Sequence, residues 1–570
     1  MLDSLATLEQ QRSGILTRIL DLGDFRSGSI TSISGPCGKP TCRCHQAGQP
    51  GHGPNYRLTR KVKGKTVSET FSSPAELRKA QLEVEAFHRF RELSVELLEV
   101  NERICRARPV QDSLTPQEKK TAEAIKQEVA TEVDALLKVI FAGQRQTGSF
   151  DLEAVETTTR AAMHRAGTAM LAHVLSEEGP VATTVACPCG EQARFHGRRR
   201  RRVLTAVGEA EIERAYYYCP HCHQGQSPRD RELDIVDTDY SPGVRRMMAV
   251  VGSETSFDRG RTQLELLAGL AVTRKAVERH AETIGEASAK CEQAQIHRAL
   301  QLDLPVVAGP RIPILYIEMD GTGVPVVRAE TEGRKGKNGD APAHTREVKL
   351  GAVFTQTTVD EEGRPLRDEG STTYTGAIET AEEFGRRLYT EAWERGWSRA
   401  DKKVILGDGA VWIWNIADRE FPGAVQIVDL YHAREHVWDI AGRLFPTDAA
   451  KSKQWGGQLK EKLDEGKIET LVEQLRSFPA PNPETAEMLR IEADYFERNA
   501  ERMRYPAFRK QKLFVGSGVI EAACRTVIAQ RLKLSGMFWT VRGANQIIAL
   551  RCCLLNREFE DYWADRSKAA

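Results

Sequence analysis

Two aspartates, far apart in the sequence, stand where carboxylates of an α/β protein often bind ligands. Asp320 ends the apolar run Ile-Leu-Tyr-Ile-Glu-Met-Asp-Gly, and Asp408 ends Lys-Val-Ile-Leu-Gly-Asp-Gly. Both runs are typical of buried strands, and the carboxyl edge of such strands is the usual ligand-binding edge of a sheet. Asp-Gly alone is more often a turn, so neither aspartate identifies a site by itself.

Glu521 is the third acidic residue of interest. It lies in Gly-Ser-Gly-Val-Ile-Glu-Ala-Ala-Cys-Arg, near the start of a predicted helix that Ser517 can cap. Residues 502–551 contain ten Lys or Arg, and Glu521 is their only acid. A salt bridge to Arg525, one turn further on, is the simple structural explanation. A site that cleaves phosphodiesters also needs this combination, because carboxylates hold the metal ions and the neighbouring cations hold the phosphate.

Together, Asp320, Asp408 and Glu521 predict a two-metal site for DNA cleavage and joining. Two Mg²⁺ or Mn²⁺ ions about 3.5–4 Å apart can activate a water and stabilise a leaving oxygen. Mg²⁺ prefers oxygen ligands and keeps some of its waters, so three carboxylates can suffice. A freed 3′-hydroxyl could then attack target DNA at the same ions.

Seven of the twelve cysteines fall in two tight clusters, which indicates metal binding. One cluster flanks a predicted β-hairpin with a turn near Gly208, and its four thiols match a zinc ribbon: Cys187, Cys189, Cys219 and Cys222. Its first pair is unusually close, so His196, His221 or His223 could replace one ligand. The other cluster predicts a second structural Zn²⁺ with three cysteines and a histidine: Cys37, Cys42, Cys44 and His45, with His52 nearby.

Net charge is only +1, so the distribution of charge is more informative than its sum. Basic segments predict contacts with double-stranded DNA, with a solvated surface as the alternative. The residues concerned are Arg198, Arg199, Arg200, Arg201 and Arg202 in the hairpin; Arg274, Lys275 and Arg279 on the second helix of a helix-turn-helix pattern; and Arg525, Arg531 and Lys533 beyond the glutamate. Trp539 could stack on a base or lie in the core.

No apolar run reaches the roughly 18 residues of a membrane helix, and the start lacks the features of a signal peptide. We therefore expect a cytoplasmic, nucleoid-associated protein without a membrane partner, in which the cysteines are not disulfide-bonded.

The patterns predict a multidomain α+β protein. In the catalytic region they predict strands over 312–319, 324–329 and 348–355, a helix over 375–397, and strands over 403–407 and 424–428. The expected segments are an N-terminal helical and Cys/His module (1–110), a helical region (111–179), the zinc-ribbon hairpin (180–240), the helix-turn-helix region (241–310), the first part of the α/β core (311–433), an all-α insertion (434–510) and C-terminal helices (511–570).

Five segments resemble insertion-sequence transposases of the ISKra type, which are related to the Mutator-like group. These segments are Met-Asp-Gly-Thr-Gly-Val-Pro (319–325), Gly-Asp-Gly-Ala (407–410), Asp-Leu-Tyr-His (429–432), Gly-Ser-Gly-Val-Ile-Glu (516–521) and Ser-Gly-Met-Phe-Trp (535–539). The resemblance implies a ribonuclease-H-like core with an all-α insertion, and Asp429 and His432 near the active site. It also implies a homodimer or larger assembly acting on the element's terminal repeats and on target DNA.

Two other functions remain open from the sequence. A catalytically silent, transposase-derived regulator would bind DNA without cutting it. A structure-selective nuclease would cut DNA without joining it.

Overall fold

The computed structural model describes residues 4–45, 51–62, 65–108, 114–176, 181–336 and 342–569. The chain forms two compact units, residues 1–119 and 120–570. No described helix combines the length and the apolar content that crossing a membrane requires.

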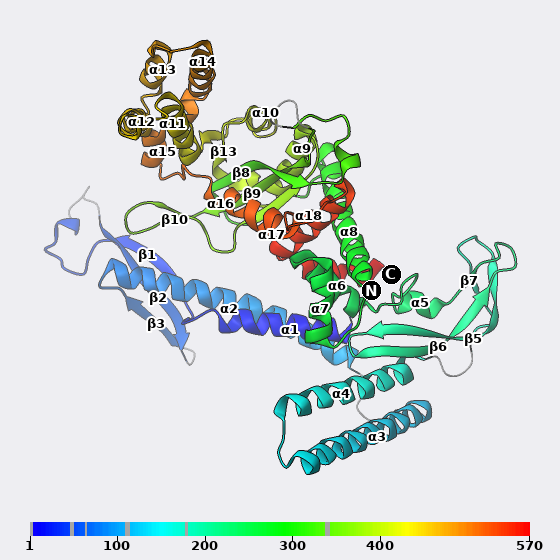
Figure 1. The fold of residues 1–570 in the computed structure, drawn as a ribbon. Helices are drawn as coiled ribbons and strands as arrows, with labels where there is room; N and C mark the ends of the chain where they lie inside the picture. The colour runs from blue at the N-terminus through cyan, green and yellow to red at the C-terminus, as the bar shows by residue number, and fades with distance from the viewer. Residues whose placement is uncertain are drawn as a thin grey trace. The chain divides into compact units, whose positions relative to one another are not determined.

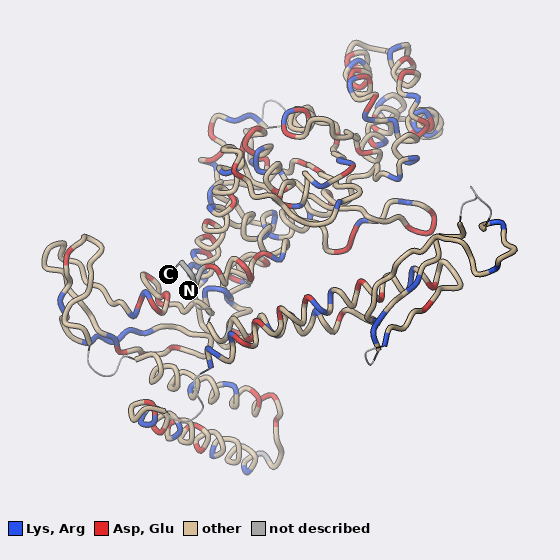
Figure 2. Tube along the Cα trace, turned by 180° about the vertical axis from the view of Figure 1, so that it is seen from behind, with Lys and Arg blue, Asp and Glu red and all other residues tan. Residues whose placement is uncertain are grey.

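The first unit joins two helices to a small antiparallel sheet (Figure 1). Leu8 and Ile15 of the first helix pack against Leu93, Val100 and Ile104 of the long second helix. Ser73 caps the long helix, along whose surface acidic and basic residues are interspersed (Figure 2). In chain order the elements are α1 (Leu5–Leu20), β1 (Ser29–Gly35), η1 (Arg43–His45), β2 (His52–Val62), β3 (Lys65–Thr70) and α2 (Pro74–Ala107).

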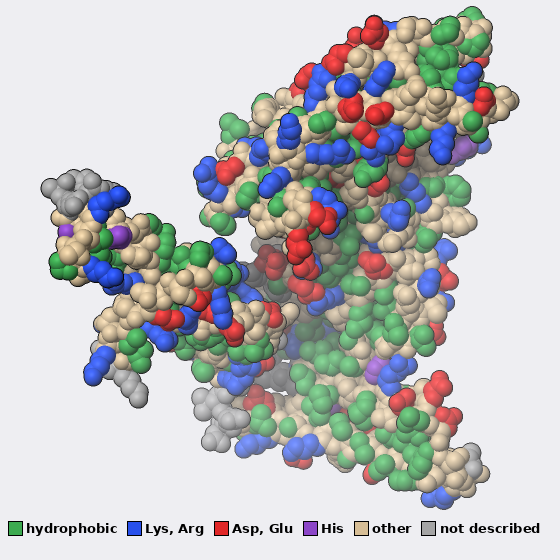
Figure 3. Space-filling model, turned by 90° about the vertical axis from the view of Figure 1, so that its left-hand side faces the viewer, with side chains coloured by type: hydrophobic (Ala, Val, Ile, Leu, Met, Phe, Trp, Pro, Cys, Tyr) green, Lys and Arg blue, Asp and Glu red, His purple; other side chains and the backbone are tan. Residues whose placement is uncertain are grey.

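The second unit begins with helices and the predicted hairpin. Strands β5 and β6 pair antiparallel and turn at Gly208, whose φ of 122° favours glycine, so this prediction is confirmed. Apolar side chains are exposed on α3 and α4, including Leu137, Phe141 and Met170, and they gather in the lower part of Figure 3. The elements are α3 (Pro116–Thr147), α4 (Leu152–Leu175), β4 (Thr184–Ala186), β5 (Gln192–Thr205), β6 (Gly208–Tyr218), β7 (Gly225–Gln226) and α5 (Pro228–Glu232).

A helical region follows, and a short connection joins two helices where the sequence predicted helix, turn and helix. The first helix ends in a π-turn at Gly269, and Thr273 caps the second helix with a hydrogen bond from the Ala276 N–H. The second helix continues for 27 residues and packs along α18 (Val541–Leu555). The elements are α6 (Pro242–Glu254), α7 (Phe257–Gln263), η2 (Leu264–Ala268) and α8 (Arg274–Leu300).

A five-stranded mixed sheet forms the centre of the second unit, in the order β12-β9-β8-β13-β14. Strand β9 is antiparallel to both of its neighbours, whereas β13 is parallel to β8 and β14. One side packs on α9 and α10, and the other packs on α8, α16 and α18. The elements are β8 (Ile312–Pro325), η3 (Arg328–Thr331), β9 (Thr345–Gln356), β10 (Thr358–Val359), β11 (Pro365–Leu366), β12 (Thr373–Ala377), α9 (Ala381–Glu394), η4 (Trp397–Arg399), β13 (Ala400–Gly407), α10 (Val411–Glu420) and β14 (Val425–Val428).

Two expectations for this sheet were wrong. The predicted strand 312–319 continues to Pro325, because Gly321 and Gly323 keep the pairing with Lys349 and Glu347 rather than forming a turn. The rest of the second predicted strand, 326–329, lies beyond β8, and Arg328–Thr331 forms the short helix η3 instead. The predicted helix over 375–397 begins later, at Ala381, since Thr373–Ala377 pairs with β9 as the edge strand β12.

The predicted helical insertion is confirmed, and the last helices return to the sheet (Figure 1). The insertion and its flanks comprise α11 (Leu430–Leu444), α12 (Ala449–Asp464), α13 (Ile468–Ser477), α14 (Pro483–Arg498), η5 (Ala500–Met503) and α15 (Tyr505–Lys510). The final elements are α16 (Gly518–Ala523), η6 (Cys524–Ala529), α17 (Gln530–Leu532), α18 and α19 (Phe559–Ala569).

Helices α8 and α18 approach closely at Gly285. A Cβ atom there would lie 2.0 Å from the backbone oxygen of Gln546, whereas a Cβ on Gly442 of α11 would meet open space. We expect Gly285→Ala to lower the free energy of unfolding by about 1–3 kcal/mol through overpacking. Gly442→Ala should raise it by about 0.5–1 kcal/mol, because alanine favours a helix interior. Thermal unfolding compares the two variants, and a Gly285→Ala protein as stable as wild type would contradict this packing.

Candidate active site and metal centres

Asp320, Asp408 and Glu521 line one cavity of about 1270 Å³. Asp320 lies on β8, Asp408 directly follows β13, and Glu521 lies on α16. The parallel pairing of the two strands ends at Leu406 and Glu318, so Asp408 and Asp320 each follow two residues later, Asp408 just after β13 and Asp320 within the longer strand β8. Three segments separated by many residues therefore present carboxylates to one space.

Asp320 is largely buried and accepts two hydrogen bonds. The Gly321 N–H donates to Oδ1 at 2.7 Å, and the Cys524 thiol donates to Oδ2 at 3.3 Å. Burial raises the pKa of Asp320, and the negative charge of Asp408 raises it further, although both hydrogen bonds lower it. Because two like charges are held near each other, a cation between them would be stabilised.

Asp408 sits in a turn that is held by the helical insertion. Its Oδ1 accepts from the Ala410 N–H at 2.8 Å, and its backbone oxygen accepts from the Tyr495 hydroxyl at 3.0 Å. Gly409 has a φ of 100°, and a Cβ there would lie 2.7 Å from the Tyr495 ring. The insertion thus fixes the conformation of the Asp408 turn from α14.

Asp429 is a buried carboxylate that joins α11 to the segment before α16. Its Oδ1 accepts from the His432 N–H at 2.6 Å and caps α11, and its Oδ2 accepts from the Ser517 N–H. The Ser517 side chain, expected to cap α16, makes no capping bond, and its hydroxyl lies 3.4 Å from Glu521 Oε1. Asp429 therefore holds the backbone that leads to Glu521.

His432 lines the same cavity as the three carboxylates. Its Nδ1 lies 3.5 Å from a carboxylate oxygen of Glu435, and its ring contacts that of His436 at 5.0 Å. His436 in turn stacks on Tyr495 at 4.2 Å and lies 2.7 Å from Glu492. Asp429 and His432 thus both reach the site from the start of helix α11.

Glu318 is a site residue that the sequence analysis missed. It is fully buried, and its Oε2 accepts from the Ile520 N–H at 2.8 Å, beside Glu521. Burial raises the pKa of Glu318 to about 8, although the hydrogen bond from Ile520 lowers it. An acid inside the apolar run Ile-Leu-Tyr-Ile-Glu-Met was the available signal. Cys524 and Tyr495, the other missed residues, become visible only through tertiary contacts.

The five hairpin arginines differ in their surroundings. Arg200 and Arg202 pair with Glu211, and the Arg199 guanidinium lies 3.5 Å from the centre of the Tyr216 ring. Arg201 is mostly buried against Asp230 at 2.8 Å, so its expected DNA contact was wrong, and it stabilises the hairpin instead. Arg198 also lies on β5, at intermediate exposure.

Beyond the glutamate, the expected DNA contact of Arg531 was wrong, and Trp539 adopts the second of its two predicted roles, in the core. Arg531 is fully buried, donates to the Gly252 oxygen and lies over the rings of Phe257 and Trp539. Trp539 is 6% exposed and donates its indole N–H to the Leu532 oxygen at 3.0 Å, so it belongs to the core. The other predicted cations are exposed: Arg274, Lys275, Arg279, Arg525 and Lys533.

The second cysteine cluster has the geometry of a zinc site. Cys187 and Cys222 lie 3.5 Å apart at sulfur, and Cys189 and Cys219 lie 3.7 Å apart. Zn–S bonds of 2.3 Å in a tetrahedron place sulfurs about 3.8 Å apart. Hydrogen bonding from the Cys222 backbone lowers the pKa of Cys219 to about 6 despite burial. All four cysteines converge, so a histidine replacement is not needed to complete the set.

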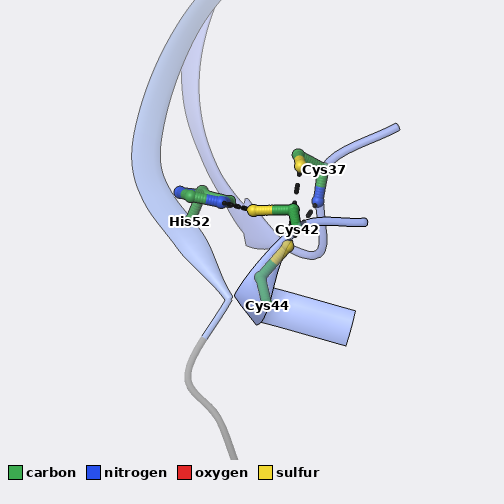
Figure 4. Close-up of side chains that lie close together, drawn as sticks. All are labelled: Cys37, Cys42, Cys44 and His52. Atoms are coloured by element: carbon green, nitrogen blue, oxygen red, sulfur yellow. Dashed lines mark hydrogen bonds between the residues drawn. The ribbon is translucent and has the colours of Figure 1, made fainter. Parts of the chain in front are cut away.

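The first cluster also converges, with one ligand different from the expectation. Cys37, Cys42, Cys44 and His52 have ligand atoms within 4.8 Å of one another (Figure 4). His52 rather than His45 completes this set, because the start of β2 brings His52 Nε2 to 3.0 Å from the Cys42 sulfur. His45 Nε2 contacts the Cys37 backbone oxygen instead. Hydrogen bonds from the Cys44 backbone and from His52 lower the pKa of Cys42 to about 6.

Comparisons with known proteins identify little of the chain. Residues 5–79, which include the first cysteine cluster, match the family model "Domain of unknown function (DUF6788)". A chain of the Drosophila P element transposase strand transfer complex shows 8% identity and a TM-score of 0.20, over 58% of this chain and 83% of that one. A TM-score of this size is too low to establish a shared fold. No curated protein matches the sequence.

Zinc content tests both cysteine clusters. We expect the purified chain to carry two Zn²⁺ ions, because each cluster supplies four ligand atoms at zinc spacing. Cys219→Ser should retain one ion, and Cys105→Ser, at an exposed position on α2, should retain both. Elemental analysis by mass spectrometry gives the count. A wild-type chain free of zinc, or a Cys219→Ser chain with two ions, would overturn the assignment.

The role of Glu318 can be tested by paired substitutions. Glu318→Ala leaves the buried Ile520 N–H without its acceptor, so we expect it to lower the free energy of unfolding by about 1–3 kcal/mol. Glu318→Gln keeps an acceptor oxygen and should remain near wild type. Thermal unfolding of both variants measures the difference. Equal stability of the two would show that this hydrogen bond does not hold α16.

Proposed function

We propose that the chain is a DNA transposase that binds the ends of an insertion sequence and cuts and joins DNA at Asp320, Asp408 and Glu521. The observation that carries the proposal is the shared cavity of these three carboxylates. Four of the five segments that resemble ISKra-type transposases contribute residues to that cavity: Met319 and Asp320, Asp408, Tyr431 and His432, and Gly516 to Glu521.

The sheet order supports a ribonuclease-H-like core. The first three strands of this sheet, β8, β9 and β12, form an antiparallel meander, and β13 and β14 are added parallel on the other side of β8. In this arrangement the first and fourth strands are neighbours, which is what places Asp320 beside Asp408. The helical insertion lies between Asp408 and Glu521, as the resemblance implies.

The donor set fits two Mg²⁺ or Mn²⁺ ions. Carboxylate oxygens are the ligands these ions prefer. Burial and the neighbouring charge of Asp408 destabilise the ionised form of Asp320, and a bound cation would compensate for this. Asp320, Asp408 and Glu521 would hold the ions. When bound, such ions lower the pKa of water and neutralise charge on the phosphate.

The other residues of the site position these carboxylates and meet the DNA. Asp429 and Glu318 accept hydrogen bonds from the Ser517 and Ile520 N–H groups and so hold the backbone that carries Glu521, and Tyr495 holds the Asp408 turn. Arg364 and Arg509 line the same cavity, where they would contact phosphates. Arg364 pairs with Asp360, whereas Arg509 makes no ion pair with any described residue.

In this proposal the remaining segments bind the element's ends. The zinc-stabilised hairpin presents Arg200 and Arg202, and the start of α8 presents Arg274 and Lys275, to double-stranded DNA. Two ends must be joined in one reaction, so two or more copies of the chain would act together.

The test uses a supercoiled plasmid that carries the DNA encoding this chain with its flanking sequence. With Mg²⁺, wild type should cut and join at the element's ends, and Asp320→Asn, Asp408→Asn and Glu521→Gln should each reduce cleavage by at least roughly 10³-fold. Asp401→Asn is the matched control, because Asp401 lies at the opposite end of β13 and pairs with Arg311. DNA binding measured by mobility shift should remain in all variants.

Two outcomes would contradict the proposal. Equal cutting by wild type and Asp408→Asn would place the metal site elsewhere. Tight end binding without any cutting by wild type would identify a non-catalytic DNA-binding protein instead.

A further inference from the structure

Phe538 and Trp539 are adjacent aromatic residues with opposite surroundings. Trp539 is 6% exposed, whereas Phe538 is 65% exposed. The backbone around them is fixed, because Trp539 donates to the Pro325 oxygen at 3.1 Å and accepts from the Val327 N–H at 2.9 Å. The buried indole therefore anchors the segment to the end of β8, and the fold holds the Phe538 ring outward.

Phe538 lines a cleft with four exposed basic side chains. The cleft has a volume of about 1130 Å³, and we call it the Phe538 cleft; its basic residues are Arg328, Arg334, Lys335 and His344. One acid, Glu332, is also among its lining residues. Arg328, Arg334 and Lys335 make no ion pair with any residue that the structure describes, unlike Arg200 and Arg202 of the hairpin. No described residue therefore neutralises these three charges.

An exposed aromatic ring among unpaired cations is the chemistry that binds an unpaired nucleotide. The ring stacks on a base and the cations hold the phosphates. A single exposed phenylalanine would not indicate a ligand, but here the ring is held rigidly and the cations surround it.

The position of the cleft relates it to the carboxylate cavity. Strand β8 leads from Asp320 to Val326 at the edge of the cleft, which is roughly 20 Å at about 3.3 Å per residue. Lys533 lies along this path, with its Nζ 2.6 Å from the Thr322 hydroxyl. At about 3.4 Å per nucleotide, this distance corresponds to about six nucleotides of one strand.

We infer that the Phe538 cleft binds an unpaired nucleotide about six nucleotides from the phosphate that is cut, with its base stacked on Phe538. The inference rests on the proposed function for the location of the cut, and on the cleft alone for the chemistry. Arg328, Arg334 and Lys335 hold the adjacent phosphates. Phe538 also lines a second, smaller cavity with Arg274, so the same DNA can continue toward the start of α8.

The experiment measures binding without catalysis. The probe is a single-stranded 12-nucleotide oligo(dT) with one central 2-aminopurine, mixed with the full chain in the absence of Mg²⁺. Stacking on Phe538 should quench the fluorescence, and Phe538→Ala should abolish the quenching and weaken binding by about 5- to 150-fold. Phe538→Trp should retain both, because it keeps a stacking surface. Phe150→Ala, which removes another exposed ring elsewhere, should match wild type.

Folding and self-association serve as the accompanying readouts. Phe538→Ala should melt near wild type, whereas Trp539→Ala should melt well below it, because only Trp539 is buried. Unchanged quenching and affinity in Phe538→Ala would overturn the inference. It would also be overturned if Phe538→Ala changed only the oligomeric state in light scattering, since the ring would then contact a second copy of the chain. Quenching that depends on Phe538 in a chain that never cuts DNA would support the cleft while contradicting the transposase proposal.

Discussion

The parallel pairing of β8 with β13 is the interaction on which the candidate site depends. Its register sets Leu406 beside Glu318, and Asp320 and Asp408 each follow two residues later on the two strands. A shift by one residue would turn each side chain to the opposite face of the sheet. The tight turn at Gly409, packed by Tyr495, then fixes Asp408 in place.

Holding like charges close together costs free energy, which the surrounding structure must offset. The third carboxylate arrives on a separate helix, which is held by two buried acids: Glu318 accepts from Ile520, and Asp429 accepts from Ser517. Burial raises the pKa of Glu318 to about 8, so this acid acts as a neutral hydrogen-bonding group at neutral pH and adds little repulsion. The helical region supports the site at two places: Asp429 stands at the start of α11, and Tyr495 of α14 holds the Asp408 turn.

Local patterns predicted the hairpin at Gly208, the helices over 434–510 and the aspartate that follows β13, Asp408. They failed where contacts between distant segments decide the local structure. Gly321 and Gly323 were expected to end a strand, yet pairing with β9 continues it, and Thr373–Ala377 is a strand only because β9 lies beside it. Arg531 and Trp539 have the composition of a DNA-binding surface, but their mutual stacking buries them. His52 replaces His45 because the start of β2 brings it back to the cysteines.

Binding of Mn²⁺ to the zinc-loaded chain, followed by electron paramagnetic resonance, tests the central claim that the converging carboxylates form a divalent-cation site. The account predicts at least one bound Mn²⁺ per chain, with affinity reduced by roughly tenfold or more in Asp320→Asn and in Asp408→Asn and unchanged in Asp401→Asn. Mn²⁺ binding that is absent from wild type, or that persists unchanged in both site variants, would contradict it.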